Sequence, residues 1–293
     1  MKKVLVLFLI IVVFVKSYSQ IIDNKYNFSN HNPTLLNPAF MSIDKKIDLY
    51  LGQRIQWIDL TNSPENFVFA VSSPVYDNMA IGLKINNQSL GIFRAFTFNF
   101  RYSYNFLISK NHNISLGLDL NYVQNNVNIS SLYTEELQDP ALYSPSLLQN
   151  NFYNGFGIMY NFKDFYFGAS SPIVYNIRSG ELLRCLNSQV YYDFYINNKK
   201  YLIQPYILTY VDDFNLKYVD FKMKFEFKNK VFIQTGYRTL NEMSYSVGFI
   251  FNSVGFAYCY EHGLNTLSYL SKGSHEIALF FKFNTPKIDI NNE

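Results

Sequence analysis

The stretch FTFNFRYSYNF, residues 96–106, alternates without a break between two kinds of side chain. Every even position holds a phenylalanine or a tyrosine, and the odd positions hold Thr97, Asn99, Arg101, Ser103 and Asn105. Successive side chains of a β-strand point to opposite faces of the sheet. The pattern therefore predicts a strand with one apolar face and one polar face.

The same alternation recurs along most of the chain, for example in KYVDFKMKFEFK, residues 217–228. Such segments are longer than the roughly five or six residues of an ordinary soluble strand, and they suit the roughly 9 to 11 residues of a tilted bilayer crossing. The predicted strands are centred near residues 50, 69, 83, 100, 118, 157, 167, 192, 205, 222, 234, 247, 258 and 279.

The connections between these strands differ in length according to which side they fall on. If the mature N-terminus is periplasmic, the external connections are 53–65, 87–94, 124–152, 171–188, 211–216, 240–243 and 262–274. The periplasmic ones are then 74–78, 107–112, 162–164, 197–200, 228–230 and 252–253. The longest connections all lie on the external side, which is typical of a membrane barrel.

These patterns predict an all-β fold, a transmembrane outer-membrane β-barrel of about 14 antiparallel strands. The rings of residues 96–106 would face lipid, with Tyr102 and Tyr104 towards one interface, and the polar positions would line the lumen. A soluble β-sandwich whose apolar faces pack together is the alternative. A sandwich does not explain why the longest connections all fall on one side. The aromatic content of 18% carries little weight alone, because Asn, Lys and Ile are abundant too.

Two predicted hairpins bring opposite charges together on the polar face of neighbouring strands. With the short turns that the sequence indicates, Arg101 lies opposite Asp119, and Asp220 lies opposite Arg238. Oppositely charged residues that meet across strands neutralise a polar interior. We therefore expect these two pairs in the lumen.

The first residues, MKKVLVLFLIIVVFVKSYSQ, combine two lysines, an apolar run from Val4 to Val15 and a small-x-small pattern before Gln20. These features are typical of a cleaved secretory signal peptide, here 1–19, for export to the cell outer membrane. An uncleaved anchor is a minor alternative, since a membrane helix needs about 20 residues. No later apolar stretch approaches that length, so any membrane span must be β.

Export changes what the charge balance means. Lys2, Lys3 and Lys16 lie in the signal peptide, which leaves 22 basic residues against 22 acidic ones. The isoelectric point of about 8.6 is therefore no evidence for a nucleic-acid partner. Cys185 and Cys259 are expected to be unpaired thiols, with a disulfide as the alternative.

Three segments follow the signal peptide. They are a pre-barrel segment or plug, 20–45, the transmembrane barrel, 46–284, and a C-terminal periplasmic tail, 285–293. The pre-barrel segment contains Pro33 and Pro38, which are expected to block regular structure. We expect it to sit in the periplasmic mouth of the barrel; an unstructured tether is the alternative.

The sequence contains no nucleophile elbow, Walker loop, dinucleotide fingerprint or zinc-protease motif, so we expect neither catalysis nor a cofactor or metal. Glu261-His262 and His275-Glu276 bracket the last external connection. A metal site there is a minor alternative to hydrogen bonding at the rim. Asp212-Asp213 is interpreted as a solvated acidic turn rather than a calcium site or a catalytic pair.

The external connection 124–152 is more apolar than a solvated loop requires. It is interpreted either as a surface for a partner or as a lid tucked into the barrel mouth, and the two interpretations stay open. The apolar residues that carry this hypothesis are Tyr133, Leu137, Leu142, Tyr143, Leu147 and Leu148.

Three segments of the chain resemble one known family. YNFSNHNPTLLNPAFMS, residues 26–42, is similar through Asn37-Pro38-Ala39 to the N-terminal signature of the PorP/SprF family of type IX secretion system membrane proteins. GSHEIALFFKF, residues 273–283, resembles the family's closing strand, with His275 and Glu276 near its start. FRYSYNFLISKNHNISLGLDLNY, residues 100–122, resembles its mid-chain hairpin. Phe40-Met41 departs from the usual aromatic, Ala and Gly, which implies a different turn there.

The resemblance implies an outer-membrane barrel of the fatty-acid-transporter type with a role in type IX secretion or gliding motility. It also implies a non-enzymatic protein that docks, delivers or anchors a secreted surface protein, such as a large adhesin. The expected partners are that secreted protein, periplasmic machinery of the system and outer-membrane lipid. A channel or transporter for small hydrophobic molecules is the alternative, since a fold does not fix a function.

Overall fold

The computed structural model describes residues 25–43, 45–127, 148–180, 182, 185–212, 215–265 and 269–284. The signal peptide 1–19, Asp213 and the tail 285–293 lie outside these residues. The strands are β1 (Lys46–Ile55), β2 (Glu65–Tyr76), β3 (Met79–Leu90), β4 (Phe93–Ser109), β5 (His112–Val127), β6 (Leu148–Phe162), β7 (Phe165–Asn176), β8 (Cys185–Tyr192), β9 (Phe194–Ile196), β10 (Tyr201–Asp212), β11 (Asn215–Phe227), β12 (Val231–Arg238), β13 (Glu242–Phe251), β14 (Val254–Gly263) and β15 (Ser274–Asn284).

The strands form one antiparallel sheet that closes on itself. β1 pairs with both β2 and β15, and β10 pairs with β11. The short β9 and the longer β8 both pair with β10, on either side of Asp193, and so count as one interrupted strand of the wall. The result is a closed antiparallel barrel of 14 strands, and every predicted strand centre falls inside one of them.

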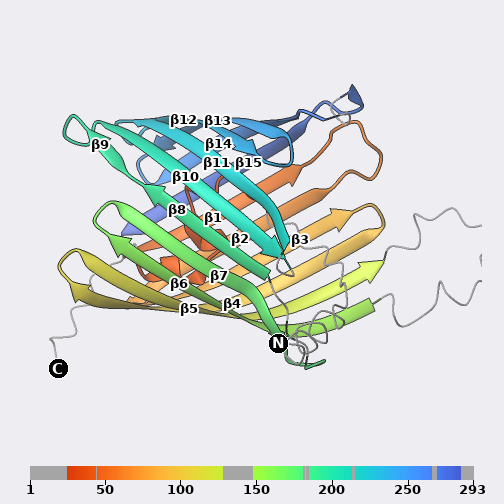
Figure 1. Ribbon diagram of the computed structural model, residues 1–293, viewed down its shortest axis with the longest axis horizontal. Coiled ribbons are helices and arrows are strands. Elements are labelled where there is room, and N and C mark those ends of the chain that lie inside the picture. Colours follow the sequence, from red (N-terminus) through yellow and green to blue (C-terminus); the bar gives the residue numbers. More distant parts are fainter. Residues whose placement is uncertain are drawn as a thin grey trace, which may run out of the picture.

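The strands are steeply tilted, and those of the front wall cross those of the back wall in Figure 1. Such tilt is required when a sheet closes into a barrel. The predicted faces are confirmed. Phe100 of β4 is 45% exposed on the outer surface, whereas its neighbour Arg101 is 2% exposed and faces the interior.

The connections are sorted by length between the two ends of the barrel, as predicted. One end, the short-turn end, carries 77–78, 110–111, 163–164, 197–200, 228–230 and 252–253. The other, the long-loop end, carries the four longest connections, 56–64, 128–147, 177–184 and 264–273, together with 91–92, 213–214 and 239–241. The short-turn end is the periplasmic end by the rule for such barrels.

Several strands run further towards the long-loop end than predicted. β3 continues as far as Leu90 and β4 already begins at Phe93, although residues 87–94 were expected to form a loop. The predicted external connections 53–65, 124–152 and 171–188 were likewise too long. Asn, Gln and Ser dominate these strand ends. Polar residues of this kind suggest a loop, but beyond the bilayer a strand keeps its ladder hydrogen bonds without an apolar face.

The chain before β1 is ordered and lies inside the barrel. Two 3₁₀ helices, η1 (Pro33–Leu35) and η2 (Pro38–Ser42), occupy it, and η2 contacts β2 through β7. The expectation that the prolines block regular structure was wrong, because Pro33 and Pro38 each begin a helix, where a missing N–H costs nothing. Among the described residues, no helix is long and apolar enough to cross a bilayer.

Candidate functional site

The interior of the barrel is occupied by residues 25–43, which we call the lumen segment. It starts at the long-loop end, where Lys25 lies 3.7 Å from Glu242. It ends near the short-turn end, where η2 is followed by Lys45 beside Asp77. The segment therefore spans the interior, and does not sit only in the periplasmic mouth as the sequence suggested.

Side chains of the wall satisfy the backbone of the lumen segment. Lys84 donates to the carbonyl of Leu35 at 3.0 Å, Lys222 to that of Tyr26 at 3.0 Å, and Ser170 to that of Leu36 at 2.8 Å. Further donors to its carbonyls are Gln234, Arg101 and Ser103. Irregular backbone without such partners is costly to bury, so these inward polar residues have a structural role.

Asn37, the first residue of the Asn-Pro-Ala motif, caps η2 and anchors it to the wall. Its Oδ1 accepts from the Ala39 N–H at 2.9 Å, and its Nδ2 donates to the carbonyls of Ile158 at 3.0 Å and Ala169 at 3.3 Å. The side chain thus joins η2 to β6 and β7. The predicted motif residues Asn37, Pro38 and Ala39 are all buried.

Glycines in the wall make room for η2. Gly117 and Gly157 lie directly opposite each other on β5 and β6, and a β-carbon on either would overlap the motif: Gly117 would meet Ala39, and Gly157 would meet Asn37. Gly168 on β7 leaves similar room for Phe40, whose ring atom would lie 2.5 Å from a β-carbon. Phe40 and Met41, the departure from the family pattern, continue η2 without a break.

His31 of the lumen segment lies in an aromatic environment. Its ring lies 4.0 Å from that of Phe232 and stacks on Phe280 at 5.5 Å between centroids. Burial, followed by the charges of Lys224, Lys282 and Lys222, holds the pKa of His31 well below its usual range. The imidazole is therefore neutral at pH 7.

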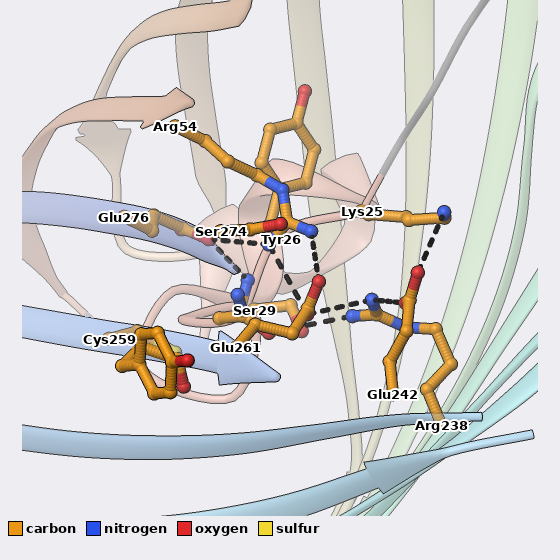
Figure 2. Close-up of polar contacts among 12 residues, drawn as sticks. Lys25, Tyr26, Ser29, Arg54, Arg238, Glu242, Cys259, Glu261, Ser274 and Glu276 are labelled. Carbon is orange, nitrogen blue, oxygen red and sulfur yellow. Dashed lines mark hydrogen bonds and ion pairs between the residues drawn. The ribbon is translucent and has the colours of Figure 1, made fainter. Parts of the chain in front are cut away.

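Two arginines share one carboxylate at the long-loop end, as Figure 2 shows. Arg54 Nη2 lies 2.6 Å from Glu261 Oε1, and Arg238 Nη1 lies 2.9 Å from Glu261 Oε2. Arg54 also reaches Glu276 at 3.4 Å, and Arg238 reaches Glu242 at 2.6 Å. All five residues are buried. Loss of one charge would leave its partners uncompensated inside the barrel.

The two predicted cross-strand pairs are present in the lumen. Arg101 lies opposite Asp119, with Nε and Oδ1 2.7 Å apart, and Asp220 lies opposite Arg238, with Oδ2 and Nη2 3.1 Å apart. All four are at most 2% exposed. The Asp220 pair belongs to the arginine network, because Arg238 serves both.

The resemblance singled out His275 and Glu276, and the structure separates them. Glu276 faces the interior, where it accepts from the Asn27 N–H at 3.1 Å. His275 lies on the outer face, where its Nδ1 is 2.6 Å from the Tyr258 hydroxyl. His262 is exposed, whereas Glu261 is buried, so the two histidines and two glutamates of the metal alternative do not converge. Within the described ranges no group of three or more His, Cys, Asp or Glu is suited to a metal ion.

A cavity of about 750 Å³ lies between the lumen segment and the wall at the short-turn end. The lumen segment contributes His31 and Phe40 to its lining, and the turns at the mouth contribute residues that include Lys199, Lys200 and Asn229. Further polar lining residues are Asp48, Asp193, Gln204, Lys224 and Glu226. Aromatic and aliphatic side chains, among them Tyr191, Leu202 and Phe280, also line it, so the cavity has a mixed lining.

Some predicted residues cannot be placed, and others were missed. Tyr133, Leu137, Leu142, Tyr143 and Leu147 lie outside the described residues, and Leu148 begins β6 without a described side chain. Cys185 and Cys259 are buried free thiols. Arg54, Glu242 and Lys84 were not predicted from the sequence. The signal for Arg54 and Lys84 was a charged residue on a strand whose outward neighbours are apolar.

Comparison with known proteins decides the family. The profile of the family described as type IX secretion system membrane protein PorP/SprF matches residues 18–281. The chain belongs to the PorP/SprF family. Membership makes it an outer-membrane component of type IX secretion. The match covers the lumen segment as well as nearly the whole barrel. No curated protein matches the sequence.

Structural comparison finds solved outer-membrane barrels that are similar to this PorP/SprF protein. Omp33 of Acinetobacter baumannii is 7% identical with a TM-score of 0.50, over 82% of this chain and 98% of that one. A FadL homologue of Pseudomonas aeruginosa is 10% identical with a TM-score of 0.48, over 85% and 92%. The P. putida toluene transporter TodX is 10% identical with a TM-score of 0.47, over 87% and 94%. Identities this low show the fold alone.

Proposed function

We propose that this PorP/SprF protein is a non-enzymatic docking ring of the type IX system, which holds or delivers a secreted surface protein. The observation that carries the proposal is the occupied lumen. Wall residues around the barrel hydrogen-bond the lumen segment, including Lys84 of β3, Ser170 of β7 and Lys222 of β11. A barrel whose wall residues hold a bound segment in the lumen is better suited to be a rigid support than a channel.

The long-loop end supports the same proposal. The connections of β1–β2 and β14–β15 are tied together there, since Ile58 N–H donates to the Gly273 carbonyl at 2.9 Å and Lys272 N–H donates to the Ile58 carbonyl at 3.0 Å. The buried arginine network lies beneath them. We propose that this braced rim, with the apolar residues of 128–147, is the surface that a partner meets.

The alternative, a channel for small hydrophobic molecules, is less well supported. The cavity at the short-turn end carries several Lys, Asp and Glu side chains beside its aromatic and aliphatic ones, whereas sites for apolar ligands are lined mainly by apolar and aromatic groups with only a few polar ones.

Co-purification tests the proposal. The mature protein with a C-terminal affinity tag is recovered from detergent-solubilised outer membranes, and the proteins that accompany it are identified by mass spectrometry. One dominant large secreted protein makes this chain a dedicated anchor, and periplasmic machinery makes it a core component. Recovery of the barrel alone contradicts docking and favours the channel.

A further inference from the structure

Two adjoining turns at the short-turn end gather four lysines. The turn 197–200, between β9 and β10, carries Lys199 and Lys200, and the turn 228–230, between β11 and β12, carries Lys228 and Lys230. The turns are in contact, because the Lys228 N–H donates to the Lys200 carbonyl at 2.7 Å. We call these four residues the lysine cluster.

Aromatic rings of the outer surface lie under the lysine cluster. The ammonium groups of Lys228 and Lys200 lie 5.2 Å and 5.7 Å from the ring centroid of Phe227. Lys200 also lies 5.4 Å from the ring of Tyr201. Tyr201 and Phe227 are register partners, each 40% exposed on the lipid-facing side. Cation–π attraction thus holds two ammonium groups at the edge of the apolar belt.

The positive charge of the lysine cluster is not neutralised by the described part of the chain. In the part of the chain that the structure describes, no carboxylate forms an ion pair with any of the four lysines. The neighbouring Glu226 forms its ion pair with Lys224 instead, at 3.3 Å. The other short turns do not repeat the arrangement: 163–164 has one lysine followed by Asp164, 110–111 has one lysine, and 77–78 and 252–253 have none. The cluster is therefore a local feature of this part of the rim.

We propose that the lysine cluster binds the phosphate headgroup of an anionic phospholipid of the membrane. Lys200 and Lys228 meet the phosphate, with Lys199 and Lys230 beside them, and the acyl chains run along the outer surface. Exposed apolar side chains continue from the cluster along that surface, at Ile196, Phe225 and Val231. A lipid fits better than a soluble acidic protein, because the lysines lie over rings that face the bilayer.

This inference is independent of the proposed docking function and needs only the insertion of the barrel into a membrane. The test is native mass spectrometry of the detergent-purified protein titrated with phosphatidylglycerol, which is anionic, or phosphatidylethanolamine, which is zwitterionic. The wild type is expected to retain phosphatidylglycerol preferentially. K200Q/K228Q is expected to bind it about 25-fold more weakly, or about fivefold for each lysine.

Two matched variants separate a specific site from general attraction. K110Q/K163Q removes the same charge from other short turns and is expected to stay within about twofold of the wild type, while K200R/K228R is expected to retain binding. All these side chains lie at the surface of turns, and circular dichroism of each variant checks that the barrel has folded.

Any one of the following results would overturn the inference. They are equal retention of phosphatidylglycerol by wild type and K200Q/K228Q, an equal loss in K110Q/K163Q, and no preference over phosphatidylethanolamine. The fourth is complete displacement by millimolar inorganic phosphate, which would make the site one for free phosphate. Lysine-dependent capture of an acidic protein without lipid preference would assign the cluster to that protein instead.

Discussion

Gly157 of the wall faces Asn37 of the lumen segment so closely that a β-carbon at position 157 would overlap the Asn37 side chain. Asn37 in turn donates to carbonyls on β6 and β7. The Asn-Pro-Ala motif therefore forms a contact between the lumen segment and the barrel wall. A chain that lacks either the glycine or the asparagine cannot form this interface.

A larger side chain at this contact should weaken the fold. We expect Gly157→Val to lower the free energy of unfolding by about 1–3 kcal/mol, because overpacking forces η2 away from the wall. Urea unfolding in lipid vesicles measures the change. The matched control Phe156→Leu alters the lipid-facing neighbour on the same strand and should change it by less than about 0.5 kcal/mol. Equal unfolding midpoints for Gly157→Val and the wild type would refute this interface.

Removal of Arg238 should be more costly. Arg238→Met leaves Asp220, Glu242 and Glu261 without one cation inside the barrel, and we expect a loss of about 3–5 kcal/mol. Lys272→Met is the control. It breaks the exposed pair with Asp59, 2.8 Å long, and should leave the free energy of unfolding nearly unchanged, because solvent screens such a pair. Similar losses for both variants would show that the network contributes no more than a surface pair.

The lowered pKa of buried His31 predicts that the stability of the fold depends on pH. Its pKa in the folded protein is lowered by burial and by nearby lysines, whereas in the unfolded chain the imidazole takes up a proton near its ordinary pKa of about 6.5. The unfolded state then binds more protons, so the contribution of His31 is present above that pH and is lost on acidification, by up to about 1.4 kcal/mol per pH unit.

The measurement compares the wild type with His31→Phe, which keeps a ring between Phe232 and Phe280. Unfolding free energies between pH 7.5 and pH 5 should fall less steeply in the variant. Parallel curves would mean that His31 is not held neutral in the lumen.

The proposed partner surface is tested by its apolar residues. Replacement of Tyr133, Leu137, Leu142 and Tyr143 by serine should reduce recovery of the secreted partner at least about tenfold, as expected if these residues anchor the contact. The unfolding midpoint should stay unchanged. Undiminished recovery would assign docking to another part of the long-loop end.

The sequence predicted the barrel because a membrane wall must alternate between lipid and lumen at every residue. Phe100 and Arg101 show this rule, and the hairpin turns placed Arg101 opposite Asp119 correctly. Strand ends at the long-loop end were less predictable. Asn86 and Asn87 continue β3 where the bilayer no longer demands an apolar face.

The lumen segment could not be derived from periodicity. Its 3₁₀ turns have no repeating pattern, and the residues that hold it, such as Lys84 and Lys222, come from strands far apart in sequence. What the alternation did reveal was charge on the inner face. Which of these charges bind one another, as Arg54 and Glu261 do, depends on the closure of the barrel between β1 and β15.

The lumen segment occupies the barrel, and we propose that this occupancy makes the protein a docking ring and not a channel. Electrical recording of the purified protein in a planar lipid bilayer tests this most directly. We expect the wild type to show no stable open channel and Gly157→Val, with η2 displaced, to show conductance steps. A steady open conductance of the wild type, equal to that of Gly157→Val, would contradict the claim.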